Sequence, residues 1–213
     1  MNPPTPVLTL APDAAPVRLV ARELSVQRGD RLLINAFNFS LAAGEGVHLV
    51  GANGAGKTSL LRVLAGLASA LSGEHHIADN CPVIYLGHGL GLKPDLTVEE
   101  NLRFLLQLSG QSAMCPVADA LQAVGLARYF DARVGSLSAG QKRRVGLARL
   151  LIEPAGLWLL DEPFAALDVK AAVWLCQQLD RFIAQGGSVL LTSHQSVATM
   201  MPLRELVLGV RAC

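Results

Sequence analysis

The chain has 213 residues, enough for one α/β domain with a substantial core. Its 18 lysine and arginine residues nearly balance 17 aspartate and glutamate residues, so the charge does not indicate a nucleic-acid partner. Hydrophobic residues make up 51% of the sequence, which predicts a large core or a surface kept for a partner, yet no apolar run is long enough to span a membrane.

The first segment, residues 1–17, is rich in proline and alanine. It lacks a basic start and a continuous apolar stretch, so we expect a loose leader rather than a signal peptide, followed by one domain over residues 18–213. Four cysteines are scattered without the spacing of a metal site, at Cys81, Cys115, Cys176 and Cys213. We predict that they are free thiols in a reducing cytoplasm.

Two strands with stretches of alternating polarity are predicted at residues 18–26 and 31–41. The turn signal Arg28-Gly29-Asp30 separates them, so they could form an antiparallel flap. The next stretch, residues 46–50, is short and apolar, as a buried parallel strand should be.

A phosphate-binding pattern follows that strand directly. The spacing G-x-x-x-x-G-K-[ST] is met by Gly51, Ala52, Asn53, Gly54, Ala55, Gly56, Lys57 and Thr58, with Ser59 next. Helical apolar spacing then continues over residues 59–67 and fades near Ala70. Strand, loop and helix therefore stand in the order that a P-loop requires.

Each residue type in this loop has a physical reason. The three glycines let the backbone bend tightly and approach a phosphate, while its N–H groups point inward as an anion nest. The helix that starts near Gly56 adds its positive dipole end. Lys57 should reach the β- and γ-phosphates, and the Thr58 hydroxyl should bind Mg²⁺.

The middle third of the chain has a helical rather than a sheet pattern. Short strands are predicted at residues 75–78 and 83–86, and the glycine-rich stretch 85–95 should form a loop that carries function. Thr97-Val98-Glu99-Glu100 resembles a capping box, which predicts a helix start. We expect helices at residues 97–108, 117–124 and 136–152, most of them in a helical subdomain at about 88–150.

The last third alternates apolar strands with a helix. Buried strands are predicted at residues 157–160 and 188–192, a helix at 169–185, and a final strand at 206–208. The fold expected for the whole chain is α/β: a P-loop NTPase core with a mostly parallel sheet, an N-terminal antiparallel β flap and a helical subdomain.

Polar residues follow two of these strands at their carboxyl ends, where parallel sheets bind ligands. Asp161 fits the carboxylate that holds Mg²⁺ in a P-loop enzyme. Glu162 is placed to polarise an attacking water as a general base. His194 could hydrogen-bond a γ-phosphate oxygen, although a lone histidine is more often structural.

A second helix start built of small residues occurs at Leu137-Ser138-Ala139-Gly140-Gln141. Its free N–H groups could bind another anion. A plain helix cap by the Ser138 hydroxyl explains the same pattern, and the residues alone favour it.

Together these motifs resemble the ATP-binding cassette (ABC) ATPases, in the family's order and over residues 18–210. The matching parts are similar to Walker A at 51–58, the signature motif at 137–141, Walker B at 157–162, the D-loop at 166–168 and the switch histidine, His194. The resemblance implies ATP and Mg²⁺, with catalysis by Lys57, Glu162 and His194. It also implies a head-to-tail dimer, in which each ATP lies between one P-loop and the Ser138 and Gly140 of the other copy.

A narrower resemblance is to the CcmA type of ATP-binding protein in c-type cytochrome maturation. It rests on residues 85–88, 91–93, 96–97, 100–104 and 137–145. It implies an ATPase on the cytoplasmic face of the inner membrane, bound to an integral, CcmB-like membrane subunit. Its hydrolysis of ATP would export haem or release a haem-loaded chaperone, although this chain itself shows no haem-binding motif.

Three features depart from the general cassette pattern, of which Ala165-Ala166 in the D-loop, where Ser-Ala is common, is minor. His88 stands where most relatives have a glutamine that senses Mg²⁺ and the attacking water, and we hypothesise that His88 keeps a sensing role rather than filling space. Arg28 stands where relatives place an aromatic ring on adenine. Its guanidinium would stack more weakly, so GTP could be accepted besides ATP.

Other functions fit parts of this pattern. A cassette ATPase acting on DNA or the ribosome usually carries two cassettes or a long coiled-coil insert, and this chain has neither. A non-catalytic nucleotide sensor is disfavoured by the joint presence of Lys57, Asp161, Glu162 and His194. A transporter of the same kind with a different cargo stays open.

Overall fold

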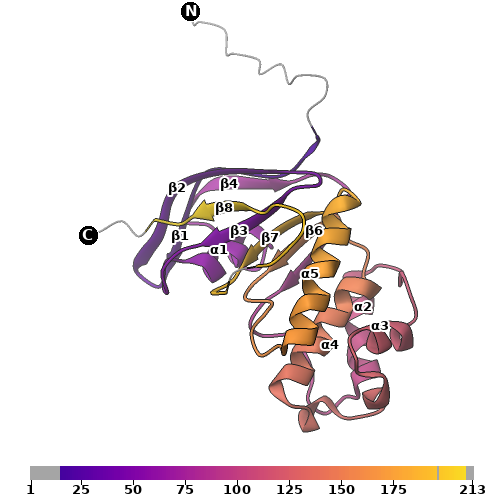
Figure 1. Cartoon of the computed structure of the whole chain (residues 1–213). Coiled ribbons are helices and arrows are strands. Elements are labelled where there is room, and N and C mark those ends of the chain that lie inside the picture. The colour runs from indigo at the N-terminus through magenta and orange to yellow at the C-terminus, as the bar shows by residue number, and fades with distance from the viewer. Residues whose placement is uncertain (1–14, 196, 210–213) are drawn as a thin grey trace, which may run out of the picture.

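The computed structural model describes residues 15–195 and 197–209. The expected leader therefore lies almost wholly outside the described residues, as does Cys213. The other three cysteines are free thiols. Within the described part, the chain forms two sheets and five α-helices (Figure 1), and none of these helices is long and apolar enough to cross a membrane.

The antiparallel sheet has three strands in the order β2-β1-β4. Strands β1 (Val17–Arg28) and β2 (Arg31–Ala42) form the predicted flap, and β4 (Ser72–Ile77) pairs with the other edge of β1. β4 begins three residues before the expected start. The reason is its pairing partner: Ser72 lies opposite Ser25 of β1, a long-range contact that extends the strand beyond its apolar residues.

The parallel sheet has five strands in the order β5-β6-β7-β3-β8. They span Val83–Leu86 (β5), Leu157–Leu160 (β6), Ser188–Thr192 (β7), Gly46–Val50 (β3) and Arg204–Val207 (β8). β6 is apolar throughout because both of its faces are covered. Leu157 and Leu159 join the core next to the antiparallel sheet, while Trp158 and Leu160 join the core under α5 (Val169–Ala184).

Helix α1 (Lys57–Leu64) is packed between the two sheets. Its Leu60 and Leu61 are fully buried in one core with Leu24 of β1 and Leu49 of β3. The helix ends at Leu64, before the predicted end, because Gly66 takes a left-handed conformation with φ 72° and the chain turns there. This packing holds the first residues of α1 next to strands of both sheets.

Helices α2 (Val98–Ser109), α3 (Val117–Ala123) and α4 (Ala139–Ile152) form a lobe with its own core. Figure 1 shows this lobe on the side of the parallel sheet away from the antiparallel sheet. The predicted capping box at Thr97 and Glu100 is present, and it starts α2. α4 begins at Ala139, later than predicted, because residues 134–136 form a separate 3₁₀ turn.

Candidate functional site

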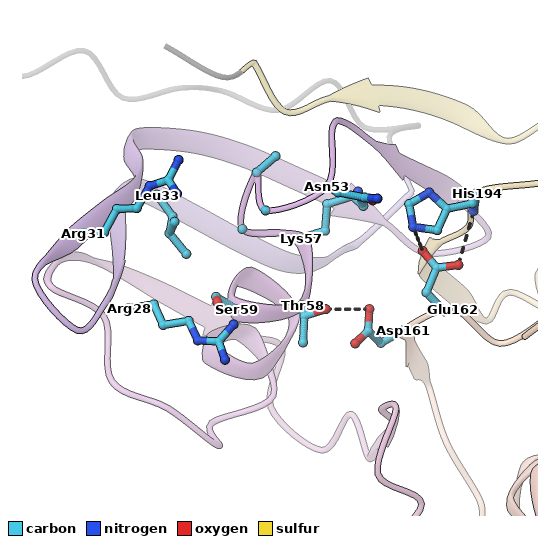
Figure 2. Close-up of a pocket in the computed structure, with 13 residues that line it drawn as sticks. Arg28, Arg31, Leu33, Asn53, Lys57, Thr58, Ser59, Asp161, Glu162 and His194 are labelled. Carbon is cyan, nitrogen blue, oxygen red and sulfur yellow. Dashed lines mark hydrogen bonds and ion pairs between the residues drawn. The ribbon is translucent and has the colours of Figure 1, made fainter. Parts of the chain in front are cut away.

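A pocket of about 310 Å³ lies between the turn of the antiparallel sheet, the P-loop and the carboxyl ends of β6 and β7. Figure 2 shows it with its lining residues: Arg28, Arg31, Leu33, Asn53, Gly54, Ala55, Gly56, Lys57, Thr58, Ser59, Asp161, Glu162 and His194. The structure thus brings together most of the site residues proposed from the sequence, although they come from four separate stretches of the chain.

The P-loop has the backbone that its glycines suggested. Gly56 precedes α1 with φ 100°, and a Cβ there would lie 3.0 Å from Cβ of Leu33, so a side chain would meet both strain and a neighbour. Gly56 makes no side-chain cap to α1. Within the described part of the chain, no side chain caps the N–H groups at the start of this helix, so they can serve an anion.

Lys57 supplies a buried positive charge inside this loop. Its side-chain nitrogen donates hydrogen bonds to the carbonyl oxygens of Gly51, at 2.6 Å, and of Ala52, at 3.2 Å. Only 8% of the residue is exposed. An electrostatic interaction with a phosphate would be stronger here than on the open surface, since less water screens it.

A small set of oxygen atoms gathers where α1 meets the end of β6. The Thr58 hydroxyl donates to Oδ1 of Asp161 at 3.1 Å, and the Thr192 hydroxyl donates to the same oxygen at 2.9 Å. Asp161 is almost fully buried. A hydroxyl and a carboxylate are the ligands that Mg²⁺ takes when phosphates and water supply the rest, so these residues fit that ion.

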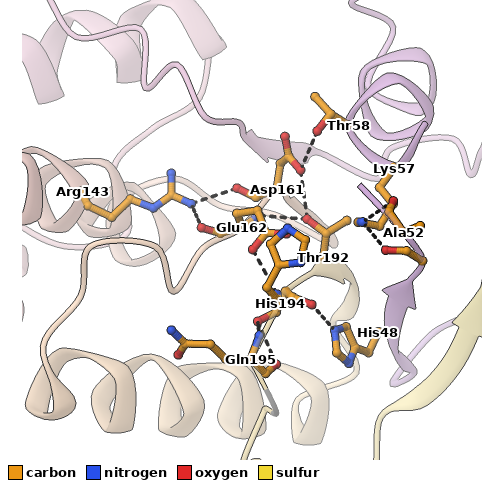
Figure 3. A network of polar contacts seen from close by, with 12 residues as sticks. His48, Ala52, Lys57, Thr58, Arg143, Asp161, Glu162, Thr192, His194 and Gln195 are labelled. Carbon is orange, nitrogen blue, oxygen red and sulfur yellow. Dashed lines mark hydrogen bonds and ion pairs between the residues drawn. The ribbon is translucent and has the colours of Figure 1, made fainter. Parts of the chain in front are cut away.

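Glu162 lies beside His194 in an unusual conformation. Its φ is 50°, a left-handed value that a glutamate rarely adopts and that often marks a functional site. Its Oε2 accepts a hydrogen bond from the backbone N–H of His194 at 3.2 Å. Its Oε1 lies 3.4 Å from Nε2 of His194 and, among the described residues, has no hydrogen-bond partner (Figures 2 and 3).

The loop that carries His194 is held by a hydrogen bond from His48, a buried residue of β3. The Nε2 atom of His48 lies 3.2 Å from the carbonyl oxygen of Ser193 (Figure 3). A carbonyl can only accept, so Nε2 is the donor. The sequence motifs include neither His48 nor Thr192. For Thr192 a signal existed, because it is the last residue of a predicted strand that ends at the ligand edge.

Five site candidates do not line this pocket: Gly51 and Ala52, whose carbonyl groups Lys57 contacts, and Ser138, Gly140 and His88. Ser138 is exposed and caps α4: its hydroxyl accepts from the N–H of Gln141 at 3.2 Å. Gly140 packs closely, since a Cβ there would lie 2.8 Å from the carbonyl oxygen of Ala166. His88 is exposed on the loop after β5.

The turn of the antiparallel sheet closes the far end of the pocket. Arg28, the residue expected near the base, lies there together with Arg31 and Leu33, which no sequence motif includes. Arg31 could not be selected from the pattern because exposed arginines beside turns are common. The two guanidinium groups give this end of the pocket a positive charge and planar stacking surfaces.

Comparison with known proteins agrees with this geometry. The family described as "ABC transporter" matches residues 34–165. A "Cytochrome c biogenesis ATP-binding export protein CcmA" from Methylococcus capsulatus is 44% identical over 202 residues, covering 90% of this chain and 98% of the relative. The protein of that name from Escherichia coli K12 is 45% identical over 187 residues, covering 83% and 89%.

Solved structures agree on the fold. A putative ABC transporter ATP-binding protein from Pyrococcus furiosus superposes with a TM-score of 0.75 at 24% identity, covering 90% of this chain and 97% of that one. A dimeric ATP-binding cassette, solved in a post-hydrolysis state with ADP and Pi, superposes with a TM-score of 0.73 at 23% identity, covering 83% and 88%.

Proposed function

The chain belongs to the ABC transporter family of ATP-binding proteins, and we propose that this ATPase is the hydrolytic subunit of a membrane complex for c-type cytochrome biogenesis. The observation that carries the proposal is the 44% identity over 202 residues to a cytochrome c biogenesis ATP-binding export protein. Such identity over nearly the whole length of both chains favours a shared role as well as a shared fold.

Nucleotide binding would use the P-loop as an anion cradle. The backbone N–H groups from Gly51 to Ser59 and the buried ammonium group of Lys57 would hold the phosphates. The base would lie toward Arg28 and Arg31 at the other end of the pocket. Because a guanidinium stacks on any base, we propose that the pocket accepts GTP as well as ATP. Stacking on a guanidinium is weaker than stacking on an aromatic ring, so the affinity for either nucleotide should be lower than an aromatic residue would give.

Mg²⁺ would be held by Thr58 and Asp161, whose side-chain oxygens already meet at 3.1 Å. The ion, when bound, neutralises charge on the β- and γ-phosphates. Thr192 orients Asp161 by its hydrogen bond, and burial limits the movement of that carboxylate. These side chains therefore present a ligand set that needs little rearrangement.

Hydrolysis would depend on the pair of Glu162 and His194. The Oε1 of Glu162, which is buried beside His194 and has no hydrogen-bond partner among the described residues, would accept a hydrogen bond from water and take its proton as the water oxygen attacks the γ-phosphorus. The bond between that phosphorus and the β–γ bridging oxygen breaks, leaving ADP and phosphate. Nε2 of His194 would donate a hydrogen bond to a γ-phosphate oxygen and stabilise the charge that develops there.

ABC ATPases form dimers and act with membrane components. We propose a head-to-tail dimer in which Ser138 and Gly140 of one copy contact the γ-phosphate bound by the other. This assignment is supported by the exposed position of Ser138 at the N-terminus of α4, where a helix dipole favours an anion. We further propose that the dimer binds an integral, CcmB-like subunit at the cytoplasmic face of the inner membrane.

His88 is proposed to sense the state of the nucleotide site and report it to that membrane subunit. Replacing His88 with alanine should lower partner-stimulated ATP turnover about fivefold, the loss of one hydrogen bond of roughly 1 kcal/mol. Basal turnover should change less. The measurement is phosphate release by the reconstituted complex, and His76→Ala, an exposed histidine of β4, is the matched control. Unchanged stimulation in His88→Ala would rule out the sensing role.

The biological assignment is tested by staining covalent haem in cells whose only copy carries Lys57→Ala. We expect c-type cytochromes to lose covalent haem while b-type haem and growth by fermentation persist. Lys170→Ala, an exposed lysine at the start of α5, should stain normally. Normal staining in Lys57→Ala would leave an ABC ATPase with another cargo.

A further inference from the structure

A buried arginine on α4 contacts the backbone around Glu162. Arg143 is 6% exposed and points from α4 toward the end of β6 (Figure 3). Its Nη2 donates to the carbonyl oxygen of Asp161 at 2.9 Å and also to that of Glu162. Its Nε donates to the carbonyl oxygen of Pro163 at 3.2 Å. One guanidinium thus holds three successive carbonyl groups.

These contacts fix Glu162 from one side while Thr192 fixes it from the other. The N–H of Glu162 donates to the Thr192 hydroxyl at 2.9 Å, and its carbonyl accepts from Arg143. Both backbone polar groups of a residue with φ 50° are therefore held by side chains from β7 and α4. A strained conformation persists only where its surroundings impose it.

The arginine also reaches a second strand end. Its Nη1 donates to the carbonyl oxygen of Gly87 at 3.0 Å, directly before His88 on the loop after β5. The backbone of Asp161 is bonded to the same region, since its N–H donates to the carbonyl of Leu86 at 2.8 Å. Arg143 therefore ties α4, the loop that carries His88 and the loop that carries Glu162 into one unit.

The energetic setting argues against a purely stabilising role. Burial lowers the pKa of Arg143, and among the described residues no carboxylate lies within ion-pair distance of it. Four carbonyl groups compensate the charge of Arg143, and the carboxylates of Asp161 and Glu162 attract it from beyond ion-pair distance. A buried charge held in this way gives little net stability compared with an apolar side chain. The other arginines of α4 differ: Arg144 pairs with Asp168, and Arg149 pairs with Glu153.

We propose that Arg143 is a positioning residue for hydrolysis: through the carbonyl groups of residues 161–163 it sets the direction of the Glu162 carboxylate. This inference rests on the proposed role of Glu162 as the general base. Arg143 does not line the nucleotide pocket. Its loss should therefore slow the chemical step while leaving the affinity for nucleotide intact.

The test compares Arg143→Met with the wild-type protein. We expect kcat for ATP to fall about 100-fold, since a misplacement of about 1 Å at a reacting group can cost that much. The Kd for ATP, measured by calorimetry, should stay within about twofold, because the P-loop contacts remain. Guanidinium ions added to a second variant, Arg143→Ala, should restore part of kcat without changing the Kd.

Arg149→Met is the matched control, because it removes another arginine from the same helix. It should lower the melting temperature, since Glu153 stays buried without its partner, but kcat should stay near the wild-type value. If Arg143→Met does not fold, Arg143→Lys is used to test the positioning role instead, because lysine keeps the positive charge but lacks the planar guanidinium fork. We expect a folded Arg143→Lys with kcat reduced about tenfold.

Two results would overturn the inference. One is a folded Arg143→Met or Arg143→Lys with wild-type kcat, and the other is a loss of kcat matched by an equal loss of nucleotide affinity. Glu162→Gln is measured in parallel. If it retains full turnover, the proposed base itself is wrong; if it is inactive while Arg143→Met is fully active, only the positioning role fails.

Discussion

Purified Lys57→Ala is expected to show no ATP turnover above background. The rate of ATP hydrolysis should fall by about 10²–10³-fold or more, because removing one preorganised electrostatic contact to a developing charge has an effect of that size. Lys57 is the only cationic residue within the P-loop sequence itself, and it is 8% exposed. No neighbouring side chain of the loop can replace it, because the other positions there are glycine, alanine, asparagine, threonine and serine.

The same variant should remain folded. Alanine is a strong helix former, and Lys57 is the first residue of α1. The bonds lost are those to the carbonyl groups of Gly51, which is half-buried, and Ala52, which is exposed, so water can replace the lysine there. Calorimetry should show loss of ATP binding with an unchanged circular dichroism spectrum, and Lys170→Ala should bind normally. ATP binding by Lys57→Ala equal to that of the wild type would refute the P-loop role of Lys57.

The part of the site formed by residues close together in the sequence could be predicted from the sequence alone. The P-loop is continuous, so strand β3, the loop and the start of α1 are all written in one run from Gly46 to Leu64. Asp161 and Glu162 could be placed because a four-residue apolar strand ends directly before them. Parallel strands end at a common edge, and this general rule put them near Lys57.

The rest of the site depends on which strands become neighbours. β7 lies between β6 and β3, and this order brings Thr192 and His194 beside Asp161 and Glu162. No local pattern gives a strand order. The role of Arg143 could not be predicted for the same reason. Helix α4 carries several arginines, and only its packing against the ends of β5 and β6 determines which of them is buried.

Boundary errors have a similar origin. The predicted strand at 75–78 began too late because the N-terminal half of β4, Ser72 to Glu74, is polar and is held by pairing with β1 alone. Helix α1 ended before its apolar pattern did, because the left-handed Gly66 turns the chain before Leu67, which is exposed. In both cases a tertiary or backbone constraint overrode the side-chain pattern.

Glu162→Gln should bind ATP but hydrolyse it about 10²–10⁴-fold more slowly, the usual contribution of a general base. Glutamine has nearly the shape of glutamate and keeps an oxygen to accept the N–H of His194, but it cannot take a proton from water. The backbone contacts to Thr192 and Arg143 are unaffected by the change. The loss should therefore be confined to the chemical step.

The same variant tests the dimer, because blocked hydrolysis should leave two copies closed on two ATP molecules. Size-exclusion chromatography with Mg-ATP should shift Glu162→Gln to a dimer, while Glu205→Gln, an exposed glutamate of β8, should behave as the wild type. Adding Ser138→Arg should abolish that dimer if Ser138 meets the nucleotide of the other copy, since a long charged side chain would occupy the γ-phosphate contact. A Glu162→Gln protein that stays monomeric and fully active would contradict both the base and the shared site, because neither would then be needed for turnover.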